Sequence, residues 1–298
     1  MKLLPKIGLF AITAAFALTI QAQELTGTLK KIKDSGTVTI GNRESSIPFS
    51  YLDDKQQPVG YSMDLCNKVV DAIKAELKMP NLKVAYNPVT SQNRITLMQN
   101  GTIDLECGST TNSIDRQKQV SFGNTTFVTG IKMLVKADSG IKDLAQLDGK
   151  AVVTTTGTTS DALIKQNEKG KKIDVKNIYG KDHSDSFLMV ESGRAAAFVM
   201  DDVLLAGLIA NAKNPKEFAI VGEALRVEPY GIMIRKDDPQ FKALVDKTLT
   251  GLMKSGEIVT IYNKWFMNPV PPKGINMNLP MSKELKDAIA NPNDKGVT

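Results

Sequence analysis

From residue 38 onward, short apolar stretches alternate with longer segments in which apolar residues recur every three or four positions. The short stretches have the length and β-branched content of buried strands, and the longer ones have the spacing of amphipathic helices. Strands that alternate with helices in this way indicate parallel sheets covered by helices, so we expect an α/β fold. The predicted strands are 38–41, 83–86, 103–107, 151–155, 175–179 and 196–200, and the predicted helices are 62–77, 92–100, 159–168, 185–191 and 203–212.

The pattern also predicts two lobes. Residues 97–106 (LMQNGTIDLE) and 188–202 (LMVESGRAAAFVMDD) each read as helix, glycine, strand and polar loop, and Gly193 sits where a helix C-cap glycine belongs. The stretches 127–136, 217–221 and 230–235 read as extended chain. We therefore expect the chain to leave the first lobe near Val128 and to return near Gly222, in two crossing strands that form a hinge. The predicted lobes are residues 23–128 with 223–298, and residues 129–222.

The end of the chain is expected to add one helix and a surface tail. The helix follows Pro239 and reaches Trp265 and Phe266. After it come a proline-rich segment and a polar end near Asn291, which we expect to wrap the surface or to fray.

The first 22 residues have the order of a secretory signal peptide. Lys2 and Lys6 precede an apolar run from Ile7 to Ile20, and Ala22 supplies a small residue for cleavage. The run is shorter than the roughly 20 residues that a spanning helix needs, which argues against an uncleaved anchor. We therefore expect a soluble periplasmic protein that is secreted through a cleaved leader.

Composition narrows the function further. The net charge of +6 falls by two when the leader is removed, and the remaining lysines are scattered rather than clustered, so nucleic acid is not an expected partner. Cys66 lies on an apolar helical stripe and Cys107 ends an apolar strand. Both read as core residues, which favours two buried thiols over a disulfide, although the compartment permits a bridge.

The candidate chemistry lies at the carboxyl ends of strands and the starts of helices, where open α/β sheets bind ligands. Arginines, hydroxyls and one histidine gather at these places, and helix N-termini favour anions. Asp201 is the only acid expected to point to the same place. A ligand with two negative groups and one positive group fits this set, and glutamate and aspartate are such ligands. The candidates are Arg43, Ser91, Arg94, Ser109, Thr111, Arg116, Thr159, His183 and Asp201.

Each candidate also has a structural alternative. The arginines could be surface residues, the hydroxyls could only cap helices, His183 could be structural, and Asp201 could cap the helix that follows it. The sequence has no zinc-ligand spacing, no phosphate-binding loop and no nucleophile elbow. Glu106 is the best candidate for a general base, with a buried structural partner of an arginine as its alternative. His183, beside Asp182 and Asp185, could orient a serine nucleophile, but nothing in the spacing favours this.

Several motifs resemble a known family. They are GNRESSIPFSY (41–51), TSQNRITL (90–97), DLECGSTTNSIDRQ (104–117), TTGTTS (155–160), KDHSDSF (181–187) and FVMDD (198–202). They resemble the periplasmic receptors of ABC amino-acid uptake systems, in the polar amino-acid-binding family, and more narrowly those for glutamate and aspartate. The likeness covers nearly the whole mature chain. Asn42 departs from the pattern, which has a histidine before the arginine, and Cys66 is also peculiar to this chain.

The resemblance implies a two-lobed periplasmic-binding-protein fold with parallel-rich sheets and a two-strand hinge. It implies that Arg116 clamps the α-carboxylate with Ser109, Thr111 and Thr159, and that Asp201 receives the α-ammonium. Arg43, Arg94, Ser91 and His183 should gather the side-chain carboxylate. The implied function is capture of L-glutamate or L-aspartate by closure of the cleft and delivery to a membrane ABC permease. The protein should be a monomer without cofactor, metal or catalytic activity; the alternatives are a different polar amino acid or a dehydratase-type enzyme.

Overall fold

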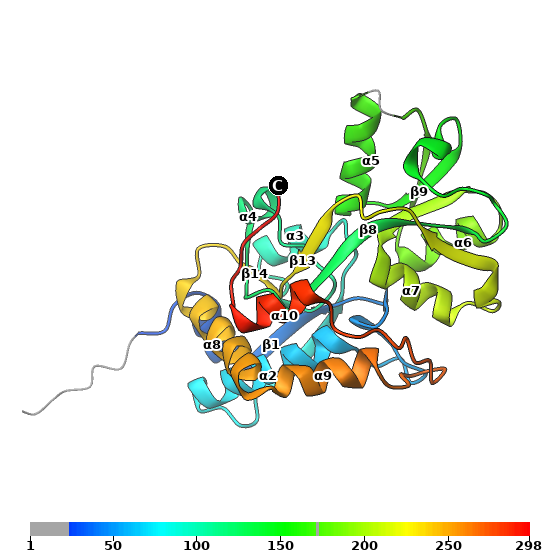
Figure 1. The fold of residues 1–298 in the computed structure, drawn as a ribbon. Coiled ribbons are helices and arrows are strands. Elements are labelled where there is room, and N and C mark those ends of the chain that lie inside the picture. The colour runs from blue at the N-terminus through cyan, green and yellow to red at the C-terminus, as the bar shows by residue number, and fades with distance from the viewer. Residues whose placement is uncertain (1–23, 171–172) are drawn as a thin grey trace, which may run out of the picture.

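Two sheets, each covered by helices, form the two lobes of the chain (Figure 1). The computed structural model describes residues 24–170 and 173–298, so the predicted leader lies outside the described residues. In the described residues no helix combines the length and the hydropathy that crossing a bilayer requires.

The first lobe is built on a sheet with the strand order β5-β1-β6-β14-β7. Strand β1 is parallel to β5 and β6, whereas β14 is antiparallel to β6 and β7. The strands are β1 (Thr37–Asn42), β5 (Lys83–Pro88), β6 (Leu105–Glu106), β7 (Val120–Phe122) and β14 (Met233–Arg235), with a small antiparallel sheet of β2 (Ser45–Ser46), β3 (Ser50–Leu52) and β4 (Pro58–Val59). The helices are α1 (Gly27–Ser35), α2 (Tyr61–Leu77), α3 (Arg94–Gln99), α4 (Ile114–Gln117), α8 (Pro239–Ser255), α9 (Glu257–Phe266) and α10 (Lys283–Ala290).

The second lobe has a sheet with the order β10-β9-β11-β8-β12, in which β9 is parallel to β10 and β11. Strand β8 is antiparallel to β11 and β12, so both sheets are mixed but retain the predicted parallel pairs. The strands are β8 (Phe127–Lys136), β9 (Ala151–Thr155), β10 (Lys176–Gly180), β11 (Ala197–Asp201) and β12 (Phe218–Val221). The helices are α5 (Thr159–Lys169), α6 (His183–Glu191) and α7 (Asp202–Asn211), with short 3-10 helices at Leu144–Leu147 and Pro215–Glu217.

Strand β8 connects the lobes. Its first part pairs with β13 (Val227–Tyr230), and its later part pairs with β11 and β12 of the second lobe. The two strands β8 and β13 therefore lie side by side between the lobes, as the predicted hinge requires (Figure 1). Strand β12 of the second lobe ends at Val221 and the returning strand β13 begins at Val227, and the lobe limits of 23–128 with 223–298 and 129–222 stay a prediction.

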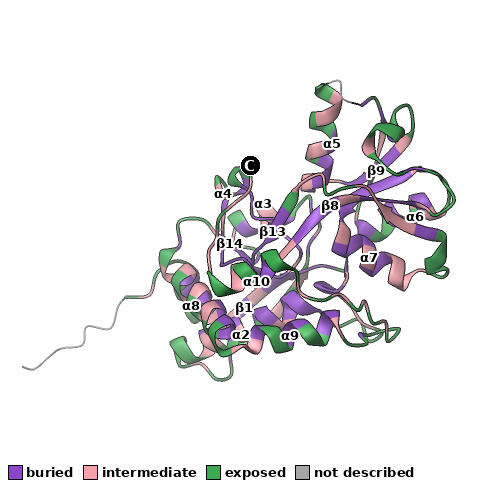
Figure 2. Cartoon of the chain, viewed as in Figure 1, coloured by how far each residue is buried: buried purple, intermediate pink, exposed green. Residues whose placement is uncertain are grey.

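An aromatic cluster fixes the first-lobe end of this hinge. The rings of Phe127 and Phe266 stack with their centroids 5.0 Å apart, and Tyr262 stacks on Phe266 at 4.4 Å. Tyr230, on the second hinge strand, packs 5.2 Å from the ring of Phe49. These rings are buried, and aromatic pairs stabilise beyond the area that they remove from water, so both hinge strands are anchored on the first lobe. Figure 2 shows that much of β8 is buried.

The structure corrects three expectations about elements. The helix after Pro239 is two helices, because Gly256 has φ +79° and ends α8 before α9 begins. The apolar spacing continues through this break, so periodicity alone did not reveal it. The predicted extended stretch 230–235 is likewise divided between β13 and β14. The C-terminal end wraps the surface, which was one of the two expected alternatives, since Val297 pairs with Ser113; the helix α10 before it was not predicted.

The cysteines are the fourth correction. Cys66 of α2 and Cys107, directly after β6, form a disulfide with Cα atoms 6.2 Å apart, so the expectation of two thiols was wrong. Both residues are buried, as expected, but burial does not distinguish a thiol from a bridge. The packing of α2 against the end of β6 decides the pairing, and a sequence does not contain that distance.

Candidate functional site

A small gap, with a cavity volume of about 10 Å³, lies between the two lobes where the predicted site residues meet. Seven of the nine candidates line it: Ser91, Arg94, Ser109, Thr111, Thr159, His183 and Asp201. Thr158, Met200 and Leu204 complete the lining and were not predicted. Arg43 lies next to His183, and Arg116 hydrogen-bonds the backbone of Thr111, so both border the gap.

Local structure explains why these side chains converge. In the first lobe Arg43 follows β1, Arg94 begins α3, and Ser109 and Thr111 follow β6. In the second lobe Thr159 begins α5, His183 begins α6 and Asp201 ends β11. The carboxyl ends of parallel strands share one edge of a sheet, and here the two edges face each other.

The lobes approach each other closely at Gly157, in the loop after β9. Its φ of +80° favours glycine, and a Cβ there would lie 2.7 Å from the Cα of Gln92 in the first lobe. The Nη2 of Arg116 also donates to the carbonyl oxygen of Gly157 at 3.3 Å. The loop that opens the second lobe's first helix is therefore in contact with the first-lobe site.

The three arginines are buried, which excludes the surface alternative. Arg43 is 0% exposed, Arg94 2% and Arg116 8%. Nε and Nη1 of both Arg43 and Arg94 have no hydrogen-bond partner among the described residues. Burial, with Arg116 as the next cause, lowers the pKa of Arg94 to about 9, which leaves it a cation at neutral pH. Buried donors of this kind call for an acceptor.

Arg116 is held differently, by its own loop. Its Nη1 donates to the carbonyl oxygen of Thr111 at 2.9 Å, and its pKa is lowered because the guanidinium is buried. Because Nη2 of Arg116 also donates to the carbonyl oxygen of Gly157, the guanidinium connects the two lobes, and its own loop fixes its orientation.

Asp201 is not the only acid at the site, contrary to the sequence expectation. Glu106 is fully buried, and its Oε1 lies 3.8 Å from Nη1 of Arg94. Its Oε2 accepts a hydrogen bond from the Thr110 hydroxyl at 2.5 Å. This is the structural alternative that the sequence left open for Glu106, a buried partner of a first-lobe arginine.

Asp182 is the second additional acid, and it joins the lobes. Its Oδ1 lies 2.5 Å from Nη2 of Arg43. Burial opposes ionisation of Asp182, but Arg43 and His183 outweigh it and lower the pKa to about 2. From the sequence, Asp182 was a candidate only as a neighbour of His183 in orienting a nucleophile. Its position directly before His183, at the start of a helix, was the signal that could have placed it at the site.

His183 is neutral and buried. Burial, followed by the nearby Arg43, lowers its pKa to about 3. Its Nδ1 lies 3.0 Å from the hydroxyl of Thr155, and its Nε2 lies 3.4 Å from Nη2 of Arg43. Arginine only donates, so Nε2 faces it as the acceptor, and His183 orients Arg43.

Asp201 differs from Glu106 and Asp182 because it lines the gap itself and, among the described residues, forms no ion pair with an arginine. The Tyr230 hydroxyl donates to its Oδ2, whereas Oδ1 has no partner among the described residues. Its side chain makes no capping hydrogen bond to α7, which excludes the capping alternative. Burial, followed by the neighbouring Glu228, raises the pKa of Asp201 to about 7.

The hydroxyl side chains divide between capping and the site. Thr158, rather than Thr159, caps α5 by accepting from the backbone N–H of Asp161. The Thr159 hydroxyl donates to Glu228 at 3.0 Å. The hydroxyls of Ser91 and Ser109 are buried and have no partner among the described residues. A small polar ligand would supply the missing partners.

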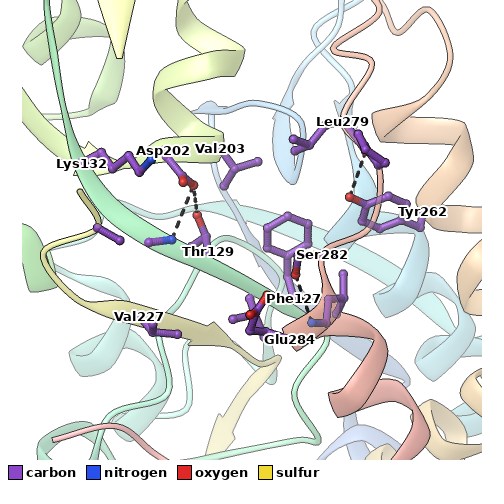
Figure 3. A pocket seen from close by; sticks show the side chains of 15 residues that line it. Phe127, Thr129, Lys132, Asp202, Val203, Val227, Tyr262, Leu279, Ser282 and Glu284 are labelled. Carbon is purple, nitrogen blue, oxygen red and sulfur yellow. Dashed lines mark hydrogen bonds between the residues drawn. The ribbon is translucent and has the colours of Figure 1, made fainter. Parts of the chain in front are cut away.

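A second hollow, with a cavity volume of about 370 Å³, lies beside the hinge strands β8 and β13. Figure 3 shows side chains that line it. Phe127, Tyr262 and Leu279 line it, together with Asp202, whose carboxylate accepts from the Thr129 hydroxyl at 2.5 Å. None of the nine predicted site residues lines this hollow. Within 24–170 and 173–298, no group of three or more potential ligand side chains is arranged to hold a metal ion.

Comparison with known proteins identifies relatives over almost the whole chain. Residues 38–268 match the bacterial extracellular solute-binding proteins, family 3. The L-glutamate/L-aspartate-binding protein of Pseudomonas aeruginosa is 54% identical over 99% of this chain and 98% of its own. The glutamate/aspartate import solute-binding protein of Escherichia coli is 50% identical over 96% and 95%. Among solved structures, an ancestral arginine-binding protein bound to arginine has a TM-score of 0.70 at 31% identity, covering 78% of this chain and 98% of that one.

Proposed function

The chain belongs to the bacterial extracellular solute-binding proteins of family 3, and from that premise we propose that it captures L-glutamate or L-aspartate for an ABC importer. The observation that carries the proposal is that three arginines are buried around one gap between the lobes: Arg94 lines it, and Arg43 and Arg116 contact residues that line it. Four of their N–H-bearing atoms, on Arg43 and Arg94, lack partners among the described residues. Relatives that are 50–54% identical are named as glutamate/aspartate-binding proteins.

We assign the ends of the ligand by charge. Asp201 offers an unpaired carboxylate oxygen, so it receives the α-ammonium group. Arg116 receives the α-carboxylate, with Ser109, Thr111 and Thr159 beside it. The unpaired nitrogens of Arg43 and Arg94, together with the Ser91 hydroxyl, take the side-chain carboxylate, and His183 acts on it through Arg43. Paired N–H groups of arginine match a carboxylate in geometry as well as in charge.

The additional acids Asp182 and Glu106 are consistent with this assignment. Asp182 and Glu106 each lie beside one arginine and offset part of its charge. The groups that still lack partners on Arg43 and Arg94 are all donors. A carboxylate can accept from every one of them, whereas the amide nitrogen of glutamine would bring a donor to donors. The site should therefore discriminate strongly against glutamine.

Binding then couples to closure. A ligand held by first-lobe arginines and by Asp201 of the second lobe stabilises only the closed arrangement, so it shifts the population toward closure. A micromolar dissociation constant corresponds to about −8 kcal/mol. Several charge-assisted hydrogen bonds of about 1.5–3 kcal/mol each supply this after the ordering costs.

The remaining features follow the family. The matched family is extracellular, and we propose that cleavage after Ala22 releases a periplasmic monomer that docks on a membrane permease. The relatives are named as binding proteins, and that of Escherichia coli is named for import, which supports transport over the dehydratase alternative.

Calorimetry of the unliganded mature protein with glutamate, aspartate and glutamine tests the proposal. We expect glutamate or aspartate to bind at least a hundredfold more tightly than glutamine. Equal affinity for glutamine would show that the arginines do not select the charge, and absence of binding to all three would remove the proposed ligand class.

A further inference from the structure

The C-terminal tail returns to the rear of the candidate site. The family match ends at residue 268, yet the chain continues through α10 to Thr298. Figure 1 shows this last segment running from α10 up to α4, the short helix that carries Arg116. A part of the chain outside the matched family region therefore contacts a ligand-binding loop.

The contact begins with backbone hydrogen bonds. The N–H of Val297 donates to the carbonyl oxygen of Asn112 at 3.1 Å, and the N–H of Ile114 donates to the carbonyl oxygen of Val297 at 2.9 Å. Further back along the tail, the N–H of Thr125 donates to the carbonyl oxygen of Asn293 at 2.8 Å. The tail thus pairs with the loop in the manner of an added strand.

Side chains reinforce the pairing at Asp294. Its carbonyl oxygen accepts from the amide of Asn112 at 2.8 Å and from the amide of Gln117 at 3.0 Å. Its carboxylate lies 2.8 Å from Nζ of Lys242 on α8. Asn112 is fully buried, so its side chain has a fixed place under the tail.

The same loop holds two residues of the proposed site. Thr111 precedes Asn112, and its carbonyl oxygen accepts from Nη1 of Arg116. Helix α4 has only four residues, too few to hold its own geometry in water, so the loop needs support from its neighbours. On one side that support is β13, because the N–H of Asn112 donates to the carbonyl oxygen of Pro229 at 2.8 Å. The tail supports the other side.

We propose that residues 291–298 position Arg116 for the ligand carboxylate by holding the loop 111–117 between the tail and β13. The inference rests on the proposed function, since it concerns the affinity for the same ligand. The tail does not line the gap, so it acts through the loop and not by touching the ligand. A binding side chain must be held within about 0.5 Å of its productive position, and loosening this loop reduces affinity.

Gly296 provides a point substitution that lifts the tail in the full chain. A Cβ at this residue would lie 3.0 Å from Nε2 of Gln117 and 3.1 Å from both the backbone N of Ile114 and the carbonyl carbon of Ser113. These distances are shorter than ordinary van der Waals contact, so Gly296→Leu should displace the tail relative to the loop. Lys295→Leu is the matched control, because Lys295 is exposed and the change adds the same side chain. A chain that ends at Asn291 is the second variant.

Calorimetry and hydrogen exchange test whether the C-terminal tail positions Arg116. We expect Gly296→Leu and the shortened chain to weaken glutamate and aspartate binding at least tenfold and to speed amide exchange at Ile114, with the control unchanged. In an Arg116→Lys background, Gly296→Leu should weaken binding by much less, which a general loss of stability would not produce. Folding is checked by thermal unfolding of each unliganded variant.

Two outcomes are decisive against the inference. Folded Gly296→Leu protein that binds within twofold of the unaltered protein overturns it, and so does a tenfold loss that is equally large in the Arg116→Lys background. If the unaltered protein itself binds neither glutamate nor aspartate, the proposed function fails, and this result is separate from the comparison of variants.

Discussion

Replacing Arg94 tests whether this residue makes the site prefer a ligand with an acidic side chain. Arg94 has two nitrogens without partners among the described residues, and two charge-assisted hydrogen bonds at about 1.5–3 kcal/mol each contribute about 3–6 kcal/mol. Since about 1.4 kcal/mol is tenfold, losing Arg94 should weaken glutamate binding by about a hundredfold to ten-thousandfold. Glutamine has a neutral side chain and does not form both charge-assisted hydrogen bonds with Arg94, so the loss of Arg94 should weaken glutamine binding much less.

The design must account for Glu106. Arg94→Met alone would leave that fully buried carboxylate without its cation, and such breaks cost about 3–5 kcal/mol of stability. The double variant Arg94→Met with Glu106→Gln avoids this cost, because Gln still offers an oxygen to the Thr110 hydroxyl. Glu106→Gln alone is the control, and it should bind glutamate within a few-fold of the unaltered protein.

Calorimetry with glutamate and glutamine gives the preference ratio for each variant, and thermal unfolding confirms the fold. Glutamate affinity within threefold of the unaltered protein in the folded double variant would refute the role of Arg94. A large loss in the Glu106→Gln control would instead show that Glu106 positions the site.

Three further predictions follow from the structure. Asp201→Asn should abolish measurable binding of α-amino acids but raise the melting temperature of the unliganded protein at pH 8. The fold raises the pKa of Asp201 from 3.8 to about 7, so its ionisation lowers the stability of the protein as pH rises through that interval. A lower melting temperature of the variant at pH 8 would contradict this reasoning. Because the ligand ammonium favours the ionised form of Asp201, binding should release a proton and weaken below about pH 7, and calorimetry in buffers of different ionisation enthalpy should detect this release; no buffer dependence would contradict it. Cys66→Ala with Cys107→Ala should lower the free energy of unfolding by about 3–4 kcal/mol, as expected for a bridge that spans 41 residues, whereas denaturant curves that coincide with those of the unaltered protein would refute a stabilising bridge.

Short-range patterns were predicted well where one physical cause dominates. The strand Ala151–Thr155 and the long strand Phe127–Lys136 have the predicted bounds, because both are rich in the β-branched residues that fit strands. Helix α2 begins one residue before its predicted start and ends at the predicted Leu77. The clearest failure is the run after Pro239, where Gly256 adopts a left-handed conformation that its neighbours in sequence do not require.

The candidate site was likewise predicted from the sequence only in part. The positions of Arg43, Arg94 and Asp201 at strand ends and helix starts were visible in the sequence, since topology places such ends at one edge of a sheet. The pairing of Asp182 with Arg43 was not, because it joins residues of different lobes that are 139 positions apart. The same is true of the tail on the loop of Arg116.

The sequence by itself determined the α/β class, the two-lobed order of elements and the kind of charge that the site presents. These depend on periodicity and on residue type, which are local properties of the chain. Only the tertiary structure decided which acids pair with the arginines, that Cys66 meets Cys107 and that the C-terminal tail lies on the loop of Arg116. The physical reason is that each of these is a distance between segments remote in sequence, and packing of the whole chain sets such distances.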